Sequence, residues 1–202
     1  MLKVKNAFGA DFELCCEQLG KQIKDRGFKP DLIIGVLTGG GYVGRSLYNY
    51  LKKDNPQLLY KETKLQRGST KLKSKSNIKI ILKKLPYSFL NIIRILEVEI
   101  LELKAKFITP SRYGTLELDK ESINFLKEGN KNVLIVDDCI DTGMTLKIIK
   151  DYISKEFNQS NDIKLAVITT AHRHPIVTAD FSLYNRVLIR FPWAYDTKSN
   201  CR

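Results

Sequence analysis

The stretch from Val133 to Leu146 constrains the fold of this chain more than any other part of it. Four apolar residues run into the adjacent acids Asp137 and Asp138, and a third acid, Asp141, precedes a Thr-Gly-Met-Thr turn and an apolar helical pattern. A short apolar run of this kind is typical of a buried parallel strand, and the turn predicts that a helix begins after it. The turn offers backbone N–H groups, two hydroxyls and the positive end of a helix dipole, which suit a phosphate group. The paired acids at the carboxyl end of the strand suit sugar hydroxyls and Mg²⁺.

A response-regulator receiver domain is the main alternative explanation of this strand, because it also carries a Val-Leu-Ile-Val-Asp-Asp run. In a receiver that run opens the domain, so on the order of a hundred residues must follow it. Here 70 residues remain from Val133, and receivers lack the Asp-Thr-Gly-x-Thr turn. The sequence therefore favours a phosphate-binding strand and turn over a receiver.

Strand and helix patterns alternate along the chain, whose 202 residues fit one domain or slightly more. Helical patterns occupy residues 11–27, about 42–53, 85–103 and about 143–157, and residues 119–128 form a short helix or loop. Strand patterns occupy residues 31–37, 58–62, 106–110, 132–137, 164–171 and 187–190. This alternation predicts an α/β fold with a doubly wound, mostly parallel sheet and flanking helices.

A second candidate phosphate site follows the first apolar strand, where Thr38 precedes three glycines that begin at Gly39. Glycines let backbone N–H groups approach an anion closely. Gly39, Gly41 and Gly44 also match the G-x-G-x-x-G pattern of dinucleotide-binding domains, and Glu62 lies roughly where a ribose-binding acid would follow. This pattern alone is a weak signal. A dinucleotide-dependent enzyme is therefore kept only as an alternative, and binding of NAD would reveal it.

The net charge of +12 is concentrated in one window of the chain. Residues 52–84 hold eleven lysines and arginines against two acids, which gives +9 there and leaves the remainder close to balanced. Such a run is most often a solvated face or a mobile loop, although contact with nucleic acid or with a membrane surface stays open. Salt-dependent affinity for nucleic acid would reveal a regulatory binding protein.

The apolar helix predicted at 85–103 is too short and too charged for a membrane span, and it fits a packing or dimer helix better. The N-terminus carries no pattern of a secretory signal, so no integral membrane segment is expected. The four cysteines form no C-x-x-C pair and fit free thiols in a reducing cytoplasm. They are Cys15, Cys16, Cys139 and Cys201.

The stretch from Val133 to Leu146 closely resembles the phosphoribosyl pyrophosphate signature of the type I phosphoribosyltransferases. The resemblance implies a transferase that uses Mg²⁺, phosphoribosyl pyrophosphate and a nucleobase, and that forms a homodimer or a higher homo-oligomer. It also implies that Asp137 and Asp138 face the ribose hydroxyls, directly or through metal-bound water, and that Asp141 is catalytic beside the nucleobase. The residues that would hold the 5-phosphate are Thr142, Gly143, Met144 and Thr145.

Within this resemblance the glycine turn is similar to the pyrophosphate-binding loop, made here by Leu37, Thr38, Gly39 and Gly40. The peptide bond between Leu37 and Thr38 would often be cis, which turns N–H groups toward the leaving group. Family members commonly carry Arg or Lys where this chain has Thr38, so Arg45 is a candidate to supply that charge to the pyrophosphate. The segment 111–114 resembles the loop that covers the site during turnover, and its Arg112 is a second candidate.

The purine enzymes that act on hypoxanthine, guanine and xanthine are the part of the family that this chain resembles most. Phe191-Pro192-Trp193 resembles their strand–Pro–Trp ending, so Phe191 and Trp193 would offer planar faces to a base. Those enzymes carry a Lys after the penultimate long strand, whereas the matching region here has none, and His172 or Arg173 would donate to the 6-oxo group instead. Orotate, uracil, adenine or another acceptor stays open.

The resemblance implies a single phosphoribosyltransferase-like domain over residues 1–202. A basic and helical insertion at about 64–104 and a C-terminal hood at about 172–202 would be added to the central sheet. The expected reaction moves a phosphoribosyl group to a ring nitrogen of a 6-oxopurine and releases pyrophosphate. Asp137 and Asp138 would hold the Mg²⁺.

Overall fold

The computed structural model describes residues 2–66, 85–105, 115–157 and 160–198. Its centre is a five-stranded sheet in the order β3-β2-β6-β7-β8, in which every neighbouring pair of strands is parallel. The strands are β2 (Leu32–Val36), β3 (Leu59–Thr63), β6 (Asn132–Ile140), β7 (Asp162–Thr170) and β8 (Phe181–Asn185). The predicted parallel α/β sheet is therefore confirmed.

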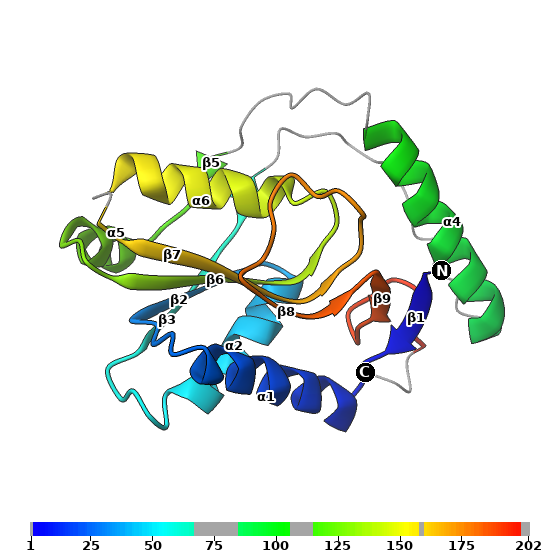
Figure 1. Ribbon diagram of the computed structural model, residues 1–202, viewed down its shortest axis with the longest axis horizontal. Helices are drawn as coiled ribbons and strands as arrows, with labels where there is room; N and C mark the ends of the chain where they lie inside the picture. The colour runs from blue at the N-terminus through cyan, green and yellow to red at the C-terminus, as the bar shows by residue number, and fades with distance from the viewer. Residues whose placement is uncertain (1, 67–84, 106–114, 158–159, 199–202) are drawn as a thin grey trace.

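Helices cover both faces of this sheet (Figure 1). On one face lie α1 (Ala10–Asp25) and α2 (Gly39–Leu51), and on the other lie α5 (Lys120–Lys127) and α6 (Met144–Glu156). Because side chains alternate along a strand, Ile33 of β2 belongs to the core under α1 and α2. Its neighbours Leu32 and Ile34 belong to the core that contains Ile149 of α6. The continuous apolar strands seen in the sequence result from this double cover.

A hood stands beside the sheet (Figure 1). Its elements are β1 (Lys3–Asn6), α4 (Tyr87–Ala105) and β9 (Val187–Arg190). β1 pairs in parallel with β9, and Leu2 and Leu188 form a small core with Ile95 and Val98 of α4. The insertion and the C-terminal hood, expected as two additions, thus pack together with the N-terminal strand. A separate short ladder joins β4 (Leu65–Gln66) to β5 (Thr115–Leu116).

A buried ion cluster fastens α4 to the C-terminal segment. The carboxylate of Asp196 accepts hydrogen bonds from Arg94 Nε at 2.9 Å, Arg94 Nη2 at 2.7 Å and Arg190 Nε at 2.9 Å. The side chains of Arg190 and Asp196 are 0% and 2% exposed. Arg190 also donates to Asn6 of β1 at 2.7 Å and to Asn91 of α4 at 2.9 Å. One carboxylate and one guanidinium therefore connect three distant segments of the chain.

The outward face of α4 is apolar. Phe89, Ile92, Leu96, Ile100 and Leu103 are each 50% exposed or more, and they follow the helical spacing seen in the sequence. The helix predicted there is confirmed, but within the described residues this stripe is not the face that packs on the hood. The packed face carries Leu90, Ile95 and Val98 together with the ion-pairing residues.

Several element boundaries differ from the sequence expectation. α2 begins at Gly39, three residues earlier than predicted, because the glycines form its first turn. β6 continues to Ile140, three residues beyond the predicted end at 137, so the two adjacent acids lie within the strand and not at its carboxyl end. β1 and β8 were not predicted, since each is short and has mixed polarity. The predicted strand at 106–110 and most of the basic segment lie outside the described residues.

None of the helices in the described ranges has the length and apolar character that crossing a bilayer requires.

Candidate active site

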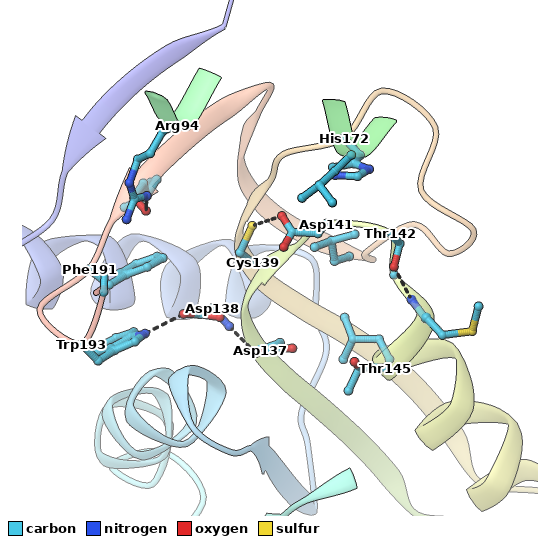
Figure 2. A pocket seen from close by; sticks show the side chains of 17 residues that line it. Arg94, Asp137, Asp138, Cys139, Asp141, Thr142, Thr145, His172, Phe191 and Trp193 are labelled. Carbon is cyan, nitrogen blue, oxygen red and sulfur yellow. Dashed lines mark hydrogen bonds between the residues drawn. The ribbon is translucent and has the colours of Figure 1, made fainter. Parts of the chain in front are cut away.

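A cavity of about 520 Å³ lies between the carboxyl end of β6 and the hood. Four parts of the chain enclose it: the end of β6 with its connection to α6, His172 after β7, the helix α4, and β9 with the segment after it (Figure 2). Ten of the residues that the sequence assigned to a site line this cavity. They are Asp137, Asp138, Asp141, Thr142, Gly143, Met144, Thr145, His172, Phe191 and Trp193.

The two adjacent acids form a half-buried carboxylate pair in this cavity. Burial and then the charge of Asp138 raise the pKa of Asp137 well above its ordinary range, and burial raises the pKa of Asp138. The backbone N–H of Asp138 donates to Asp137 Oδ1 at 2.9 Å. Within the part of the chain that the structure describes, no Lys or Arg forms an ion pair with either acid. Such a pair is stabilised by hydroxyl donors or by a cation.

The start of α6 forms a second wall of the cavity. Gly143 precedes the helix with φ of 80°, and a Cβ at this position would lie 2.8 Å from Val177 Cγ1, so the turn requires glycine. The hydroxyl of Thr142 accepts the backbone N–H of Met144 at 3.4 Å. The first N–H groups of a helix lack partners within the helix, and its dipole favours an anion there. This wall therefore suits a phosphate group.

The glycine turn and the acid pair meet in space, although about a hundred residues separate them in the sequence. A Cβ on Gly39 would lie 2.1 Å from Asp138 Oδ2, and a Cβ on Gly40 would lie 2.4 Å from the carbonyl oxygen of Val136. Contacts this close exclude every side chain, which explains the consecutive glycines. The peptide bond between Leu37 and Thr38 is cis, as the family resemblance implied, and both residues are exposed beside the turn.

Asp141 is an exposed acid on the cavity wall next to a half-buried thiol. The thiol of Cys139 donates to Asp141 Oδ1 at 3.6 Å (Figure 2). Burial and then the charge of Asp141 raise the pKa of Cys139 well above its ordinary range. Because the thiolate is the nucleophilic form, Cys139 is not suited to nucleophilic attack, whereas Asp141 is placed to accept a proton from a ligand.

His172 is a buried polar group on the hood side of the cavity. Its side chain is 3% exposed, and its Nε2 has no hydrogen-bond partner among the described residues. A buried nitrogen without a partner is costly, so a ligand group or water that reaches Nε2 would be favoured. The alternative donor, Arg173, is 61% exposed and points to acids of α4, with its guanidinium 3.9 Å from Glu102.

The ring of Trp193, which was expected to offer a free face for stacking on a base, is packed between other aromatic rings. The ring of Trp193 stacks on Phe191 at 4.9 Å on one side and on Tyr42 of α2 at 4.7 Å, and Phe12 meets it edge-on at 5.4 Å. Its indole N–H donates to Asp138 Oδ2 at 2.7 Å (Figure 2). Both faces of Trp193 are thus covered by protein, and its polar edge faces the acid pair.

The structure describes only one of the two arginines that were expected to contact pyrophosphate. Arg45 pairs with Glu62 at 2.9 Å, its side chain is 67% exposed, and it does not line the cavity. Tyr60 also donates to Glu62 at 2.8 Å, so the Glu62 carboxylate, considered as a ribose-binding acid, is already paired with two protein side chains. Arg112 lies outside the described residues.

Sequence reasoning missed the contribution of α4 to this cavity. Arg94 and Leu101 of α4 line it, together with Ile189 and Ala194 from around the end of β9. Arg94 also donates to the backbone carbonyl of Ile189 at 3.1 Å. The signal in the sequence was a lone arginine within an apolar helical stripe, which indicates a buried charge with a partner elsewhere.

The acid pair can supply part of a magnesium site. Among the described residues, no three His, Cys, Asp or Glu side chains gather as ligands for a metal ion. Mg²⁺ prefers oxygen ligands and usually takes one or two carboxylates together with waters and substrate phosphates. Two half-buried carboxylates that pair with no cation of the described residues fit that kind of incomplete ligand set.

Comparison with known families identifies the chain. Residues 10–198 match the phosphoribosyl transferase domain family, and the chain belongs to this family. Its sequence signature and fold are those of the type I enzymes, so the protein is a phosphoribosyltransferase. A comparison with curated proteins gives no match.

Solved structures with the same fold include several phosphoribosyltransferases. The purine phosphoribosyltransferase of Pyrococcus horikoshii has a TM-score of 0.57 at 18% identity, covering 96% of this chain and 95% of that one. The xanthine-guanine-hypoxanthine phosphoribosyltransferase of Helicobacter pylori has a TM-score of 0.58 at 14% identity, covering 95% and 94%. A hypothetical protein from Neisseria gonorrhoeae with bound ppGpp has a TM-score of 0.59 at 16% identity, covering 96% and 90%.

Proposed function

We propose that this enzyme transfers a phosphoribosyl group from phosphoribosyl pyrophosphate to a 6-oxopurine, namely hypoxanthine, guanine or xanthine, and depends on Mg²⁺. The proposal is carried by one observation: the Gly39 turn is packed against Asp138, and Asp138 lines the same cavity as the start of α6. Two backbone segments suited to anions therefore flank one carboxylate pair. A sugar that carries a phosphate at one end and a pyrophosphate at the other has the matching groups.

Each part of the site has a separate task in the proposed reaction. The start of α6, with Thr142 and Thr145, binds the 5-phosphate, and Asp137 and Asp138 accept hydrogen bonds from the ribose hydroxyls. The glycine turn at Gly39 donates to the pyrophosphate, where negative charge grows as the C–O bond to the sugar breaks. A bond from the sugar carbon to a ring nitrogen of the base forms, and that nitrogen gives up its proton.

Asp141 is the proposed acceptor of that proton, because it is an exposed carboxylate on the cavity wall. Mg²⁺ held by Asp137 and Asp138 would neutralise the two carboxylates and the phosphate oxygens. No covalent intermediate on the protein is needed, which agrees with the raised pKa of the Cys139 thiol.

The proposed base site lies on the hood side of the cavity. His172, with its unpartnered Nε2, is the proposed donor to the 6-oxo group in place of the lysine that related enzymes carry. The edge of Phe191 and the apolar side chains of Ile189 and Leu101 would contact the ring. Support for a purine also comes from the names of two structural neighbours, the purine enzyme of Pyrococcus horikoshii and the xanthine-guanine-hypoxanthine enzyme of Helicobacter pylori.

The cellular setting is part of the proposal. We propose that the enzyme acts in purine salvage in the cytoplasm, which is supported by the free thiols of Cys15, Cys16 and Cys139. A homodimer or higher oligomer is supported by the exposed apolar stripe of α4, since large exposed apolar patches often mark interaction sites. Sedimentation velocity of the purified protein tests the oligomeric state.

Pyrophosphate release from the purified enzyme tests the reaction. The protein is incubated with Mg²⁺, phosphoribosyl pyrophosphate and, in turn, hypoxanthine, guanine, xanthine, adenine, orotate and uracil. We expect turnover with at least one 6-oxopurine and loss of turnover when Mg²⁺ is chelated. Turnover with orotate or uracil and with no 6-oxopurine would overturn the acceptor assignment.

A paired substitution tests the assignment of the acids. Asp137→Asn combined with Asp138→Asn should lower kcat/KM by about a hundredfold or more, because both groups are proposed to orient the reacting sugar. Asp151→Asn on α6 is the matched control, since Asp151 pairs with Lys147 at 2.8 Å on the surface. Unchanged kcat/KM in the double variant would reject the assignment.

A further inference from the structure

Trp193 makes a contact that base stacking does not explain. Its indole N–H donates to Asp138 Oδ2 at 2.7 Å, a short distance typical of a hydrogen bond to a carboxylate. A hydrogen bond to a charged acceptor is roughly twice as strong as one between neutral groups. Trp193 comes from the C-terminal segment, whereas Asp138 lies within β6, so this bond joins the hood to the acid pair.

Three other aromatic rings fix the direction in which the Trp193 N–H points. Phe191 lies parallel to the indole with an angle of 2° between the planes, and Tyr42 lies at 17° on the opposite side. Phe12 of α1 stands perpendicular to the indole at 90°. Stacked and edge-to-face arrangements of this type are both favourable, so the indole has little freedom to turn away from Asp138.

The same carboxylate is confined from another direction by the glycine turn. A Cβ on Gly39 would lie within 2.3 Å of Asp138 Cγ, so the side chain of Asp138 sits against the backbone of α2's first residue. Tyr42, which covers one face of Trp193, belongs to the same helix turn. The indole, the carboxylate and the glycine turn therefore form one packed unit.

We infer that Trp193 is a positioning residue for phosphoribosyl pyrophosphate, which holds the Asp138 carboxylate toward the ribose through its indole N–H and does not stack on the acceptor base. This inference rests on the proposed function of the site. Stacking on a base would need an uncovered indole face, and both faces are occupied by Phe191 and Tyr42. The edge of the indole is the part that acts on the site.

Steady-state kinetics distinguish the two roles. Trp193→Phe retains an aromatic ring for Phe191 and Tyr42 but removes the N–H donor. We expect KM for phosphoribosyl pyrophosphate to rise about tenfold, which corresponds to roughly 1.4 kcal/mol, and KM for hypoxanthine to stay within about twofold. The control Tyr152→Phe also keeps an aromatic ring and removes a polar group, but it lies on α6 against Phe157 and away from the cavity, so KM for phosphoribosyl pyrophosphate should stay within about twofold of wild type.

Nuclear magnetic resonance tests the contact without relying on turnover or on a folded Trp193 variant. The chain has one tryptophan, so its indole N–H gives a single resonance in a ¹⁵N-labelled wild-type sample. That resonance should shift in Asp138→Asn and on titration of wild type with phosphoribosyl pyrophosphate. A titration with hypoxanthine alone should shift it much less.

The outcomes separate this inference from the proposed function. If wild type does not bind phosphoribosyl pyrophosphate, the proposed function fails and this inference fails with it. If wild type binds it but Trp193→Phe keeps the wild-type KM, only the positioning role is overturned. A rise confined to KM for hypoxanthine, or an indole resonance that responds to the base and not to the sugar pyrophosphate, would restore the stacking role and also overturn the inference.

Discussion

The strongest prediction for stability concerns Asp196, whose carboxylate joins α4 to the C-terminal segment. The substitution Asp196→Asn keeps the size of the side chain and removes its charge. Arg94 and Arg190 then share an amide oxygen in place of a carboxylate, and Arg190 is 0% exposed. Two guanidinium groups would lie close together without the anion that neutralises one of them.

The expected loss in the free energy of unfolding follows from this geometry. Removing one partner of a buried ion pair costs about 3–5 kcal/mol. We expect the lower end, about 3 kcal/mol, because Arg94 is 15% exposed and Arg190 keeps its hydrogen bonds to Asn6 and Asn91. For a chain of this size, 1 kcal/mol shifts Tm by roughly 2–4 °C, so Tm should fall by roughly 6–12 °C.

Urea unfolding followed by far-ultraviolet circular dichroism measures this loss. The matched control is Glu99→Gln on α4, because Glu99 is 44% exposed and pairs with Arg186 at 3.4 Å, and such partly exposed pairs contribute about 1 kcal/mol or less. A loss for Asp196→Asn no larger than the loss for the control would refute the reasoning. It would mean that α4 is held by its apolar contacts and not by the ion cluster.

The pH dependence of the same variant provides a second check. Burial acts to raise the pKa of Asp196, but the hydrogen bonds and charges of Arg94 and Arg190 outweigh it and lower the pKa below its usual range. A lowered pKa in the folded state contributes stability above the unfolded pKa of about 3.9 and loses it as the pH falls through the folded pKa. The difference between wild type and Asp196→Asn should therefore be constant from neutral pH to about pH 5 and shrink below about pH 4.

Three further substitutions test the site. Gly39→Ala should greatly weaken binding of phosphoribosyl pyrophosphate in calorimetry, because its Cβ would lie 2.1 Å from the carboxylate of Asp138, and wild-type affinity would contradict the close approach of the first turn of α2 to β6. Asp141→Asn should lower kcat by about 10²–10⁴ with KM for the sugar pyrophosphate nearly unchanged, and a smaller effect would remove Asp141 as the proton acceptor. His172→Phe should raise KM for hypoxanthine about tenfold and leave KM for the sugar pyrophosphate unchanged, whereas an unchanged acceptor KM would show that His172 does not contact the base.

The arrangement of the part of the site proposed to bind phosphate could be predicted from the sequence because its signals are local. The apolar run before Asp137 and the turn at Thr142 are consecutive in the chain, so one strand and one helix start place them together. The proximity of Gly39 to Asp138 also follows from topology, since β2 and β6 are neighbours and both carboxyl ends meet at one edge. Both placements follow from a parallel sheet, in which the carboxyl ends of neighbouring strands lie at the same edge.

The hood could not be predicted in the same way, because long-range contacts define it. Asn6, Arg94, Arg190 and Asp196 come from the N-terminal strand, the insertion and the C-terminal segment, and no short pattern in the sequence links them. Arg190 follows three apolar residues of a strand and carried no sign that it would be fully buried. Its burial is explained by its hydrogen bonds to Asp196 and Asn91, which only the folded structure brings beside it.

Trp193 shows what residue type alone leaves undetermined. A tryptophan near a ligand site has two faces for stacking and one polar edge for hydrogen bonding, and the sequence does not say which of them faces the ligand. Here the neighbours decide: Tyr42 and Phe191 take the faces, and Asp138 takes the edge. The aromatic residues of the hood are therefore tied to the acid pair, and the acceptor is left to the part of the cavity near His172 and α4. The helix α4 thus takes part in enclosing the proposed base site, so changes in α4 are expected to alter the choice of acceptor without altering binding of the sugar pyrophosphate.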